Sequence, residues 1–177
     1  MRHLTAQSAL SVPNESSHFI DWHLQEAFVG SPQEWQARCT WVGAASDTCP
    51  GRSAFDTRPW LGDVGVWDAT EVLARHGVQM PTEHGVNQRI WAARPWRAVL
   101  DMVLTHAAKG RVARHVALAQ WFDPVDDAAE LGRLLDAVQT HLSDLPSEMK
   151  TRLEEWLALQ ADVLEHVPEQ AHDTAHH

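Results

Sequence analysis

The chain has 177 residues, of which 24 are acidic and 14 are basic, so its formal net charge at pH 7 is -10. This charge disfavours direct binding to nucleic acid, which usually begins with a basic surface. No apolar run approaches the roughly 18 to 20 residues of a membrane span, and the first residues lack the pattern of a secretory signal, so we expect a cytoplasmic protein with no membrane partner.

The N-terminal part of the sequence predicts short helices in close succession. Residues 1–13 are small and polar, which suggests a mobile arm. Helical spacing of apolar residues then predicts a helix over 14–30. The next helix starts at Ser31, which can exchange reciprocal capping bonds with Glu34, and Pro32 suits its first turn. Its apolar stripe is expected at Trp35, Cys39 and Val42.

The middle of the chain is less regular. The segment 43–66 holds four glycines and two prolines without a sustained period, so it is the longest irregular connection. Long loops inside compact domains are often functional. After it, Asp68 and Glu71 form a capping pair for a helix that closes at Gly77. A further short helix is predicted over 82–93.

The last part of the sequence has the clearest helical periodicity. Its first helix carries an apolar stripe and ends at Lys109-Gly110; the stripe residues are Trp96, Val99, Leu100, Val103 and Ala107. The pattern continues on a new helix over 112–122. Asp123-Pro124 opens a third helix with a core face that reaches Leu142, and the final helix covers 147–167. Residues 168–177 are expected to be a flexible tail.

About seven helices with short connections, and no alternating strand of four or more residues, predict an all-α fold. We expect a single-domain helical bundle over 14–167 with an irregular 43–66 connection. The looser segment 14–93 and the tighter segment 95–167 are a further subdivision that the sequence allows.

The tripeptide Arg-Pro-Trp occurs twice, at 58–60 and 94–96. The flanking sequences share only loose hydrophobicity, so the simplest interpretation is two helix starts with a tryptophan anchor. Around the second copy, however, further arginine and tryptophan residues gather at a helix N-terminus, where they would suit anion recognition. Exposed N–H groups and arginine forks bind anions, and indole rings stack on ligands. The candidate binding residues are Arg89, Trp91, Arg94, Trp96 and Arg97. Phosphate, carboxylate and an acidic partner segment remain alternatives.

Twelve histidines raise the question of a metal site. His18 stands three residues from Glu15 and from Asp21, but a capping acid beside a surface histidine explains that spacing better than a ligand set. His106 and His115 flank a turn, so two antiparallel helices would bring them together. Histidines at the edge of the core are the simpler interpretation, and they stay weak candidates for metal binding or acid–base chemistry. We expect no cofactor.

The two cysteines, Cys39 and Cys49, are too few for a disulfide scaffold and lack CxxC spacing for zinc. Free thiols are therefore expected, with a disulfide as the alternative. The sequence also lacks a GxSxG element, a glycine-rich phosphate loop, an HExxH pair and an Asp-rich calcium loop. These absences lower the expectation that the protein is an enzyme.

The function that best fits these observations is a non-enzymatic protein–protein interaction module, acting as an accessory, adaptor or inhibitory factor. Tryptophan and arginine are enriched at interface hot spots, and another protein or a homodimer partner would use the Trp/Arg-rich surface. A small-molecule or metal-dependent enzyme in a helical bundle is the first alternative. An acidic mimic of nucleic acid is the second.

Overall fold

The computed structural model describes residues 1–14, 22–44 and 51–167 of the chain. Within these residues, five short strands form one mixed sheet in the order β3-β2-β1-β7-β4, and two further strands form a separate hairpin, β5–β6. The strands are β1 (His3–Leu4), β2 (Thr40–Val42), β3 (Arg52–Ser53), β4 (Val66–Asp68), β5 (Thr82–Glu83), β6 (Val86–Asn87) and β7 (Trp91–Ala93).

The sheet is assembled around its N-terminal strand. Leu4 of β1 pairs with Trp41 of β2 in antiparallel register and with Ala92 of β7 in parallel register. On the outer sides, β3 runs parallel to β2 and β4 runs antiparallel to β7. The middle strand is therefore completed only by segments that lie far from it in the sequence.

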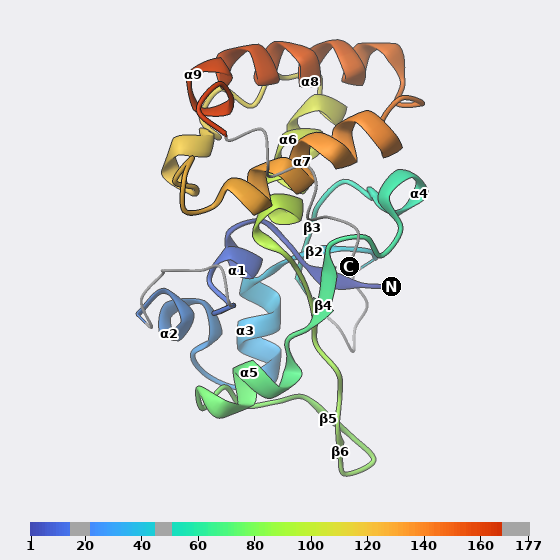
Figure 1. Cartoon of the computed structure of the whole chain (residues 1–177). Helices are drawn as coiled ribbons and strands as arrows, with labels where there is room; N and C mark the ends of the chain where they lie inside the picture. The colour runs from blue at the N-terminus through green and yellow to red at the C-terminus, as the bar shows by residue number, and fades with distance from the viewer. Residues whose placement is uncertain (15–21, 45–50, 168–177) are drawn as a thin grey trace.

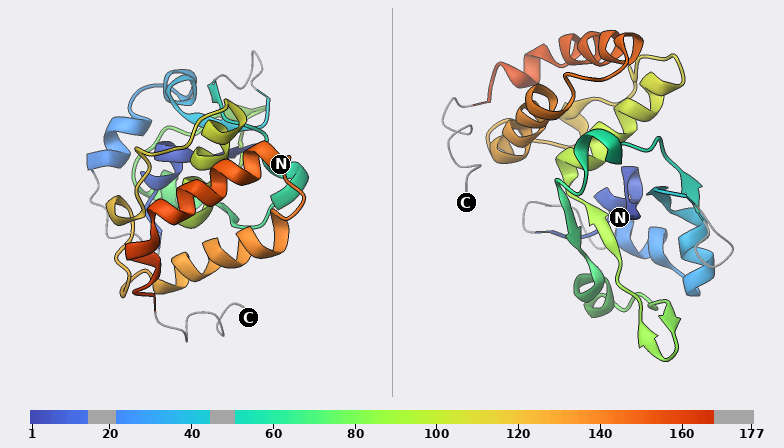
Figure 2. Two further views of the ribbon diagram at one scale, coloured as in Figure 1. Left: turned by 90° about the horizontal axis from the view of Figure 1, so that it is seen from above. Right: turned by 90° about the vertical axis from the view of Figure 1, so that its right-hand side faces the viewer.

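Helix α6 is the centre of the molecule. Figure 1 shows α7, α8 and α9 on one side of it and the sheet, with α1 and α3, on the other. Viewed along other directions, α7 and α8 lie side by side over α6, and the β5–β6 hairpin projects from the body (Figure 2). The helices are α1 (Ala6–Leu10), α2 (Trp22–Phe28), α3 (Pro32–Arg38), α4 (Arg58–Leu61), α5 (Thr70–Arg75), α6 (Pro95–Ala108), α7 (Ala128–His141), α8 (Ser147–Leu159) and α9 (Ala161–Leu164), with a 3₁₀ turn at Leu118–Gln120.

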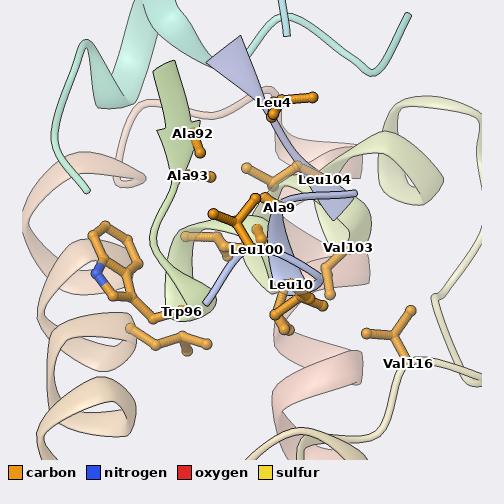
Figure 3. Packing of buried hydrophobic residues seen from close by; sticks show 14 of the residues in the cluster. Leu4, Ala9, Leu10, Ala92, Ala93, Trp96, Leu100, Val103, Leu104 and Val116 are labelled. Atoms are coloured by element: carbon orange, nitrogen blue, oxygen red, sulfur yellow. The ribbon is translucent and has the colours of Figure 1, made fainter. Parts of the chain in front are cut away.

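The core forms where α6 meets both layers. Leu100 and Val103 of α6 face Ala9 and Leu10 of α1, and Leu4 of the central strand lies close by (Figure 3). All five residues of the predicted α6 stripe are at most 3% exposed. Burial of a helix with this spacing is the expected result of hydrophobic packing on two faces.

The all-α prediction was wrong, because the sheet makes this an α/β fold and not a helical bundle. Each strand has only two or three residues, which is too short for the alternation that reveals a strand in a sequence. The helix predicted over 82–93 is absent; the same residues form the β5–β6 hairpin and β7. The helix predicted over 112–122 is reduced to the 3₁₀ turn.

The segment 1–13, expected to be a mobile arm, instead supplies β1 and α1 to the interior. His3, Leu4 and Thr5 are all fully buried. Small polar residues are typical of a mobile arm, but here the side chains of His3 and Thr5 are bonded to the buried Asp101 carboxylate. The flexible tail predicted at 168–177 and the Glu15, His18 and Asp21 spacing lie outside the described residues.

Two other local predictions were confirmed, whereas the predicted Asp68–Glu71 capping pair is not formed, because Asp68 bonds to Thr70 instead. Ser31 accepts from the Glu34 N–H, and the Glu34 carboxylate accepts from the Ser31 N–H at 2.7 Å, which is a complete capping box with Pro32 in the first turn. Helix α6 ends where the glycine at 110 takes up a left-handed conformation. None of the helices within the described residues is long and apolar enough to cross a bilayer.

Candidate functional site

The predicted Trp/Arg cluster divides into an interior part and a surface part. Trp96 is 3% exposed and its backbone N–H donates to the buried Glu130 carboxylate of α7 at 3.2 Å. Its ring lies against Gly65, whose positive φ and missing side chain allow this close approach. Trp96 therefore anchors the start of α6 and is not available to a ligand.

Arg97 belongs to a fully buried network around Asp101. Its Nε donates to Asp101 Oδ1 at 3.0 Å, and its terminal nitrogens donate to the carbonyl of Val64 at 2.6 Å and to Thr57 Oγ1 at 2.8 Å. Thr57 in turn donates to Asp101 Oδ1 at 2.7 Å. No side chain of this network is exposed to solvent, so Arg97 joins the 57–64 segment to α6.

The other carboxylate oxygen of Asp101 completes the network. Thr5 donates to Oδ2 at 2.6 Å, and His3 Nε2 lies 3.4 Å from the same oxygen. Burial alone would raise the pKa of Asp101, but the hydrogen bond with His3 and the charge of Arg97 outweigh burial and hold the pKa below its ordinary value. The network thus ties β1 to α6 with an ionised carboxylate at its centre.

Three of the predicted residues remain accessible at the edge of the sheet. Arg89 is exposed and lies 3.8 Å from the Asp68 carboxylate, whereas Trp91 and Arg94 are half-buried. The Arg94 guanidinium lies over the ring of Trp67 in β4, 5.7 Å from its centroid. We refer to Trp67, Arg89, Trp91 and Arg94 as the β4–β7 edge.

His106 and His115 lie in contact. Their ring centroids are 4.5 Å apart and the rings meet nearly at right angles. His115 does not come from a second antiparallel helix; it lies in the irregular segment that follows the turn at Gly110. This segment is held in place because Trp156 of α8 donates its indole N–H to the Val116 carbonyl at 2.7 Å.

The two histidines line a cleft of about 520 Å³ between the end of α6, strands β2 and β3, and the 3₁₀ turn. We call it the basic cleft. Arg52 of β3 and Lys109 at the end of α6 contribute two fixed positive charges to it. Thr105 and Gln120 add polar groups, and Met102, Val116 and Trp121 form an apolar wall. No aspartate or glutamate is found among the described residues that line the cleft.

The charges of the basic cleft are not neutralised internally. Neither Arg52 nor Lys109 forms an ion pair with any residue in the described ranges. Among the other arginines, Arg58 pairs with Asp56, Arg75 with Glu71 and Arg133 with Glu130, whereas Arg94, Arg111 and Arg114 form no ion pair within the described residues. What distinguishes Arg52 and Lys109 is that both line one cleft with no acid among its described lining residues.

The environment of His106 favours its neutral form. Partial burial lowers its pKa most, and His115, Lys109 and Arg111 lower the pKa further through charge repulsion. A bound anion would oppose all three charge effects. His106 is therefore poised to take up a proton when an anion enters the cleft.

A smaller cavity of about 300 Å³ lies beside the basic cleft, and Gln7 and Trp121 line both. Cys39 borders this cavity as a buried free thiol. Burial raises the pKa of the Cys39 thiol to about 11, so the reactive thiolate is scarce at neutral pH. Cys49 lies outside the described residues.

Sequence reasoning identified His106 and His115 but missed Arg52 and Lys109. Lys109 stands three residues from His106 and could have been noticed as one of only two lysines in the chain. Arg52 carried no such signal, because only the pairing of β3 with β2 brings it to the cleft. In the part of the chain that the structure describes, no cluster of three or more His, Cys, Asp or Glu side chains could hold a metal ion.

Comparison with known proteins adds no relative. No family model matches the chain, and neither a curated protein sequence nor a solved structure is significantly similar to it.

Proposed function

We propose that this protein binds a small anionic ligand in the basic cleft. The observation that supports the proposal is the pair of fixed cations, Arg52 and Lys109, which line a cleft with no acid among its described lining residues and form no ion pair within the described ranges. Cations left unpaired at a concave surface attract oxyanions, and charge-assisted hydrogen bonds hold them. The imidazole rings of His106 and His115 supply further hydrogen-bonding nitrogens.

The shape of the cleft indicates what else the ligand carries. The wall of Met102, Val116 and Trp121 gives apolar contact beside the charged groups. A ligand with a ring or short apolar body attached to a carboxylate, sulfate or phosphate group would use both parts. Ligand sites of this size commonly combine an apolar lining with a few placed polar groups.

Calorimetry with four ligands that share one ring tests the proposal: phenyl sulfate, phenyl phosphate, benzoate and neutral benzamide. We expect the anions to bind and benzamide not to bind. Lys109→Met should weaken anion binding about tenfold, the worth of one charge-assisted hydrogen bond. Lys150→Met is the matched control, because Lys150 is the other lysine and lies on the exposed side of α8.

The pH dependence of anion affinity is a second test of the same site. Phenyl sulfate keeps its charge between pH 6 and pH 8, so a change in its affinity reports on the protein. Affinity should rise as the pH falls, because the bound anion favours protonated His106. The proposal fails if none of the anions binds, or if Lys109→Met binds them as tightly as Lys150→Met does.

A second candidate function is recognition of an acidic segment of a partner protein at the β4–β7 edge. Two partly exposed tryptophans and two arginines gather there, and β4 is an outer strand of the sheet, with a backbone edge that can pair with an added strand. Extended peptides with alternating Glu and Val should bind, and the same peptides with Lys in place of Glu should not. An Arg89→Gln, Arg94→Gln double variant that binds the acidic peptides normally would exclude this function.

A further inference from the structure

A further cavity of about 980 Å³ shares no lining residue with the basic cleft. It is an open hollow lined by α3, the segment after α5 and the β5–β6 hairpin, which stands away from the body at the foot of Figure 1. Its lining is rich in amide side chains, namely Gln33, Gln36, Gln79, Asn87 and Gln88. These uncharged hydrogen-bonding groups give the cavity a different chemical character from the basic cleft.

Gln36 has the most informative environment of these residues. It is only 3% exposed, yet its side-chain amide makes no hydrogen bond with any part of the chain that the structure describes. The amide atoms of Gln36 are not among the buried side-chain atoms of the described residues that lack a partner, so they keep contact with the water of the cavity. A hydrogen-bonding ligand in the cavity could replace that water at both the donor and the acceptor of the amide.

Gln36 is also held rigidly in place. It lies on α3 between the buried Trp35 and the end of the helix, and its backbone carbonyl accepts the indole N–H of Trp41 at 3.1 Å. Trp35 donates its own indole N–H at 2.9 Å to the carbonyl of Gln79, another lining residue. The position of the unpaired amide is thus set by the core and not by chance packing at a surface.

The charges of the lining restrict the kind of ligand. No lysine, arginine or histidine is found among the described lining residues, and Glu83 is the carboxylate that faces the cavity. Glu83 is partly occupied, because it accepts from the Gln88 amide at 3.1 Å. An anion would meet this carboxylate without any compensating cation, so the cavity suits an uncharged ligand.

We propose that this cavity binds an uncharged polyhydroxylated ligand such as a sugar. Each primary amide offers a donor and an acceptor side by side, which matches neighbouring hydroxyl groups that both donate and accept. Val78, Met80 and Pro81 provide an apolar wall for the C–H face of a sugar ring. The site is independent of the anion site, which lies on other elements and has the opposite electrostatic character.

NMR titration of ¹⁵N-labelled protein with glucose, maltose and N-acetylglucosamine tests this site. Binding should shift the side-chain amide signals of the lining glutamines and the indole signal of Trp35. Glucuronate, the charged counterpart of glucose, should bind more weakly because of Glu83. Glycinamide serves as a neutral amide ligand without hydroxyl groups, and a shift with glycinamide but with no sugar would overturn the proposal.

Gln36→Leu is the decisive variant. It should weaken sugar binding by about tenfold or more, since a site built to donate and accept at Gln36 loses both bonds. Its denaturation midpoint should stay close to that of the wild type, because the amide that is removed makes no hydrogen bond with the described residues. Gln139→Leu, an exposed glutamine on α7, is the matched control and should change affinity less than twofold.

Asn87→Ala keeps the test valid if Gln36→Leu does not fold, since Asn87 lines the cavity from the exposed hairpin. It should weaken sugar binding severalfold, whereas Lys109→Met should leave sugar binding unchanged. Absence of binding by all three sugars, or equal binding by wild type and both cavity variants, would overturn the proposal.

Discussion

The two ends of α6 handle charge in opposite ways. Near its start, Arg97 and Asp101 are fully buried. The Arg97 guanidinium donates to the Asp101 carboxylate, to the Val64 carbonyl and to the Thr57 hydroxyl. At its end, His106 and Lys109 face a cleft, and the charge of Lys109 is not balanced by a carboxylate among the described residues. We call the buried network around Asp101 the closed network of α6, and the end of α6 at the basic cleft its open end.

The difference follows from the cost of removing charge from water. A buried ion is stable only when its partners replace the lost hydration, so Asp101 needs all of His3, Thr5, Thr57 and Arg97. A cation at the wall of a cleft keeps its water and can exchange that water for a ligand. Satisfied polar groups therefore mark structure in this protein, and unsatisfied ones mark candidate binding sites.

Removing Asp101 should have the largest effect on stability. Asp101→Ala leaves Arg97 buried without a counter-charge and removes the acceptor of two threonines, so we expect a loss of about 3–5 kcal/mol in the free energy of unfolding. Chemical denaturation measures this loss. Glu71→Ala is the control, because it breaks the exposed ion pair with Arg75 and should leave stability within error of the wild type. Similar results for both variants would show that the network is not buried as described.

Substitution of the two arginines of the second Arg-Pro-Trp region, Arg94 and Arg97, should lower the free energy of unfolding by different amounts in the same assay. Arg97→Gln should cost about 3 kcal/mol, since it leaves Asp101 without its cation. Arg94→Gln should cost less than about 1 kcal/mol, because it removes only a partly exposed contact with the ring of Trp67. Equal costs for the two substitutions would contradict the division into interior and surface parts.

Acid should reach the open end of α6 first and weaken the closed network only at lower pH. The pKa of Asp101 is lowered in the folded protein, so the unfolded chain binds the proton more readily. The stability that Asp101 contributes is complete above its unfolded pKa of about 3.9 and is lost as the pH falls through its lower, folded pKa. Asp101→Asn should therefore show a shallower decline of stability below about pH 4 than the wild type, as followed by denaturant midpoints across this range.

The smallest effect is expected at the open end, near neutral pH. The pKa of His106 is lowered by folding, so its contribution to stability is complete above its unfolded pKa of about 6.5 and is lost as the pH falls toward the folded pKa. His106→Gln removes this titration and should flatten the stability profile slightly between pH 7 and pH 5. A profile that becomes steeper would show that His106 is stabilised in its charged form instead.

Two features of the helices could be predicted because their information is local. The apolar spacing of α6 and the Ser31–Glu34 capping box each lie within a few residues, and both were found correctly. The sheet could not be predicted in this way. His3–Leu4 has no strand pattern of its own and becomes a strand only through Trp41 and Ala92, which lie far along the chain.

The same limit applies to the candidate sites. The contact between His106 and His115 could be anticipated because a short turn separates them. Arg52 reaches the basic cleft only through sheet pairing, and Gln36 is indistinguishable in sequence from an exposed helical glutamine until its burial is known. Arg97 illustrates the reverse case, because a residue type typical of binding surfaces serves here to fill and neutralise the interior.

The central place of β1 has a consequence for the order in which the protein folds. During synthesis β1 leaves the ribosome before either of its neighbours, and it gains its parallel neighbour only after Ala92 has followed. Until then Leu4, His3 and Thr5 lack both the strand and the Asp101 carboxylate that bury and bond them. The N-terminal strand must therefore wait as an unprotected edge, so the nascent chain is most prone to aggregation before α6 is made.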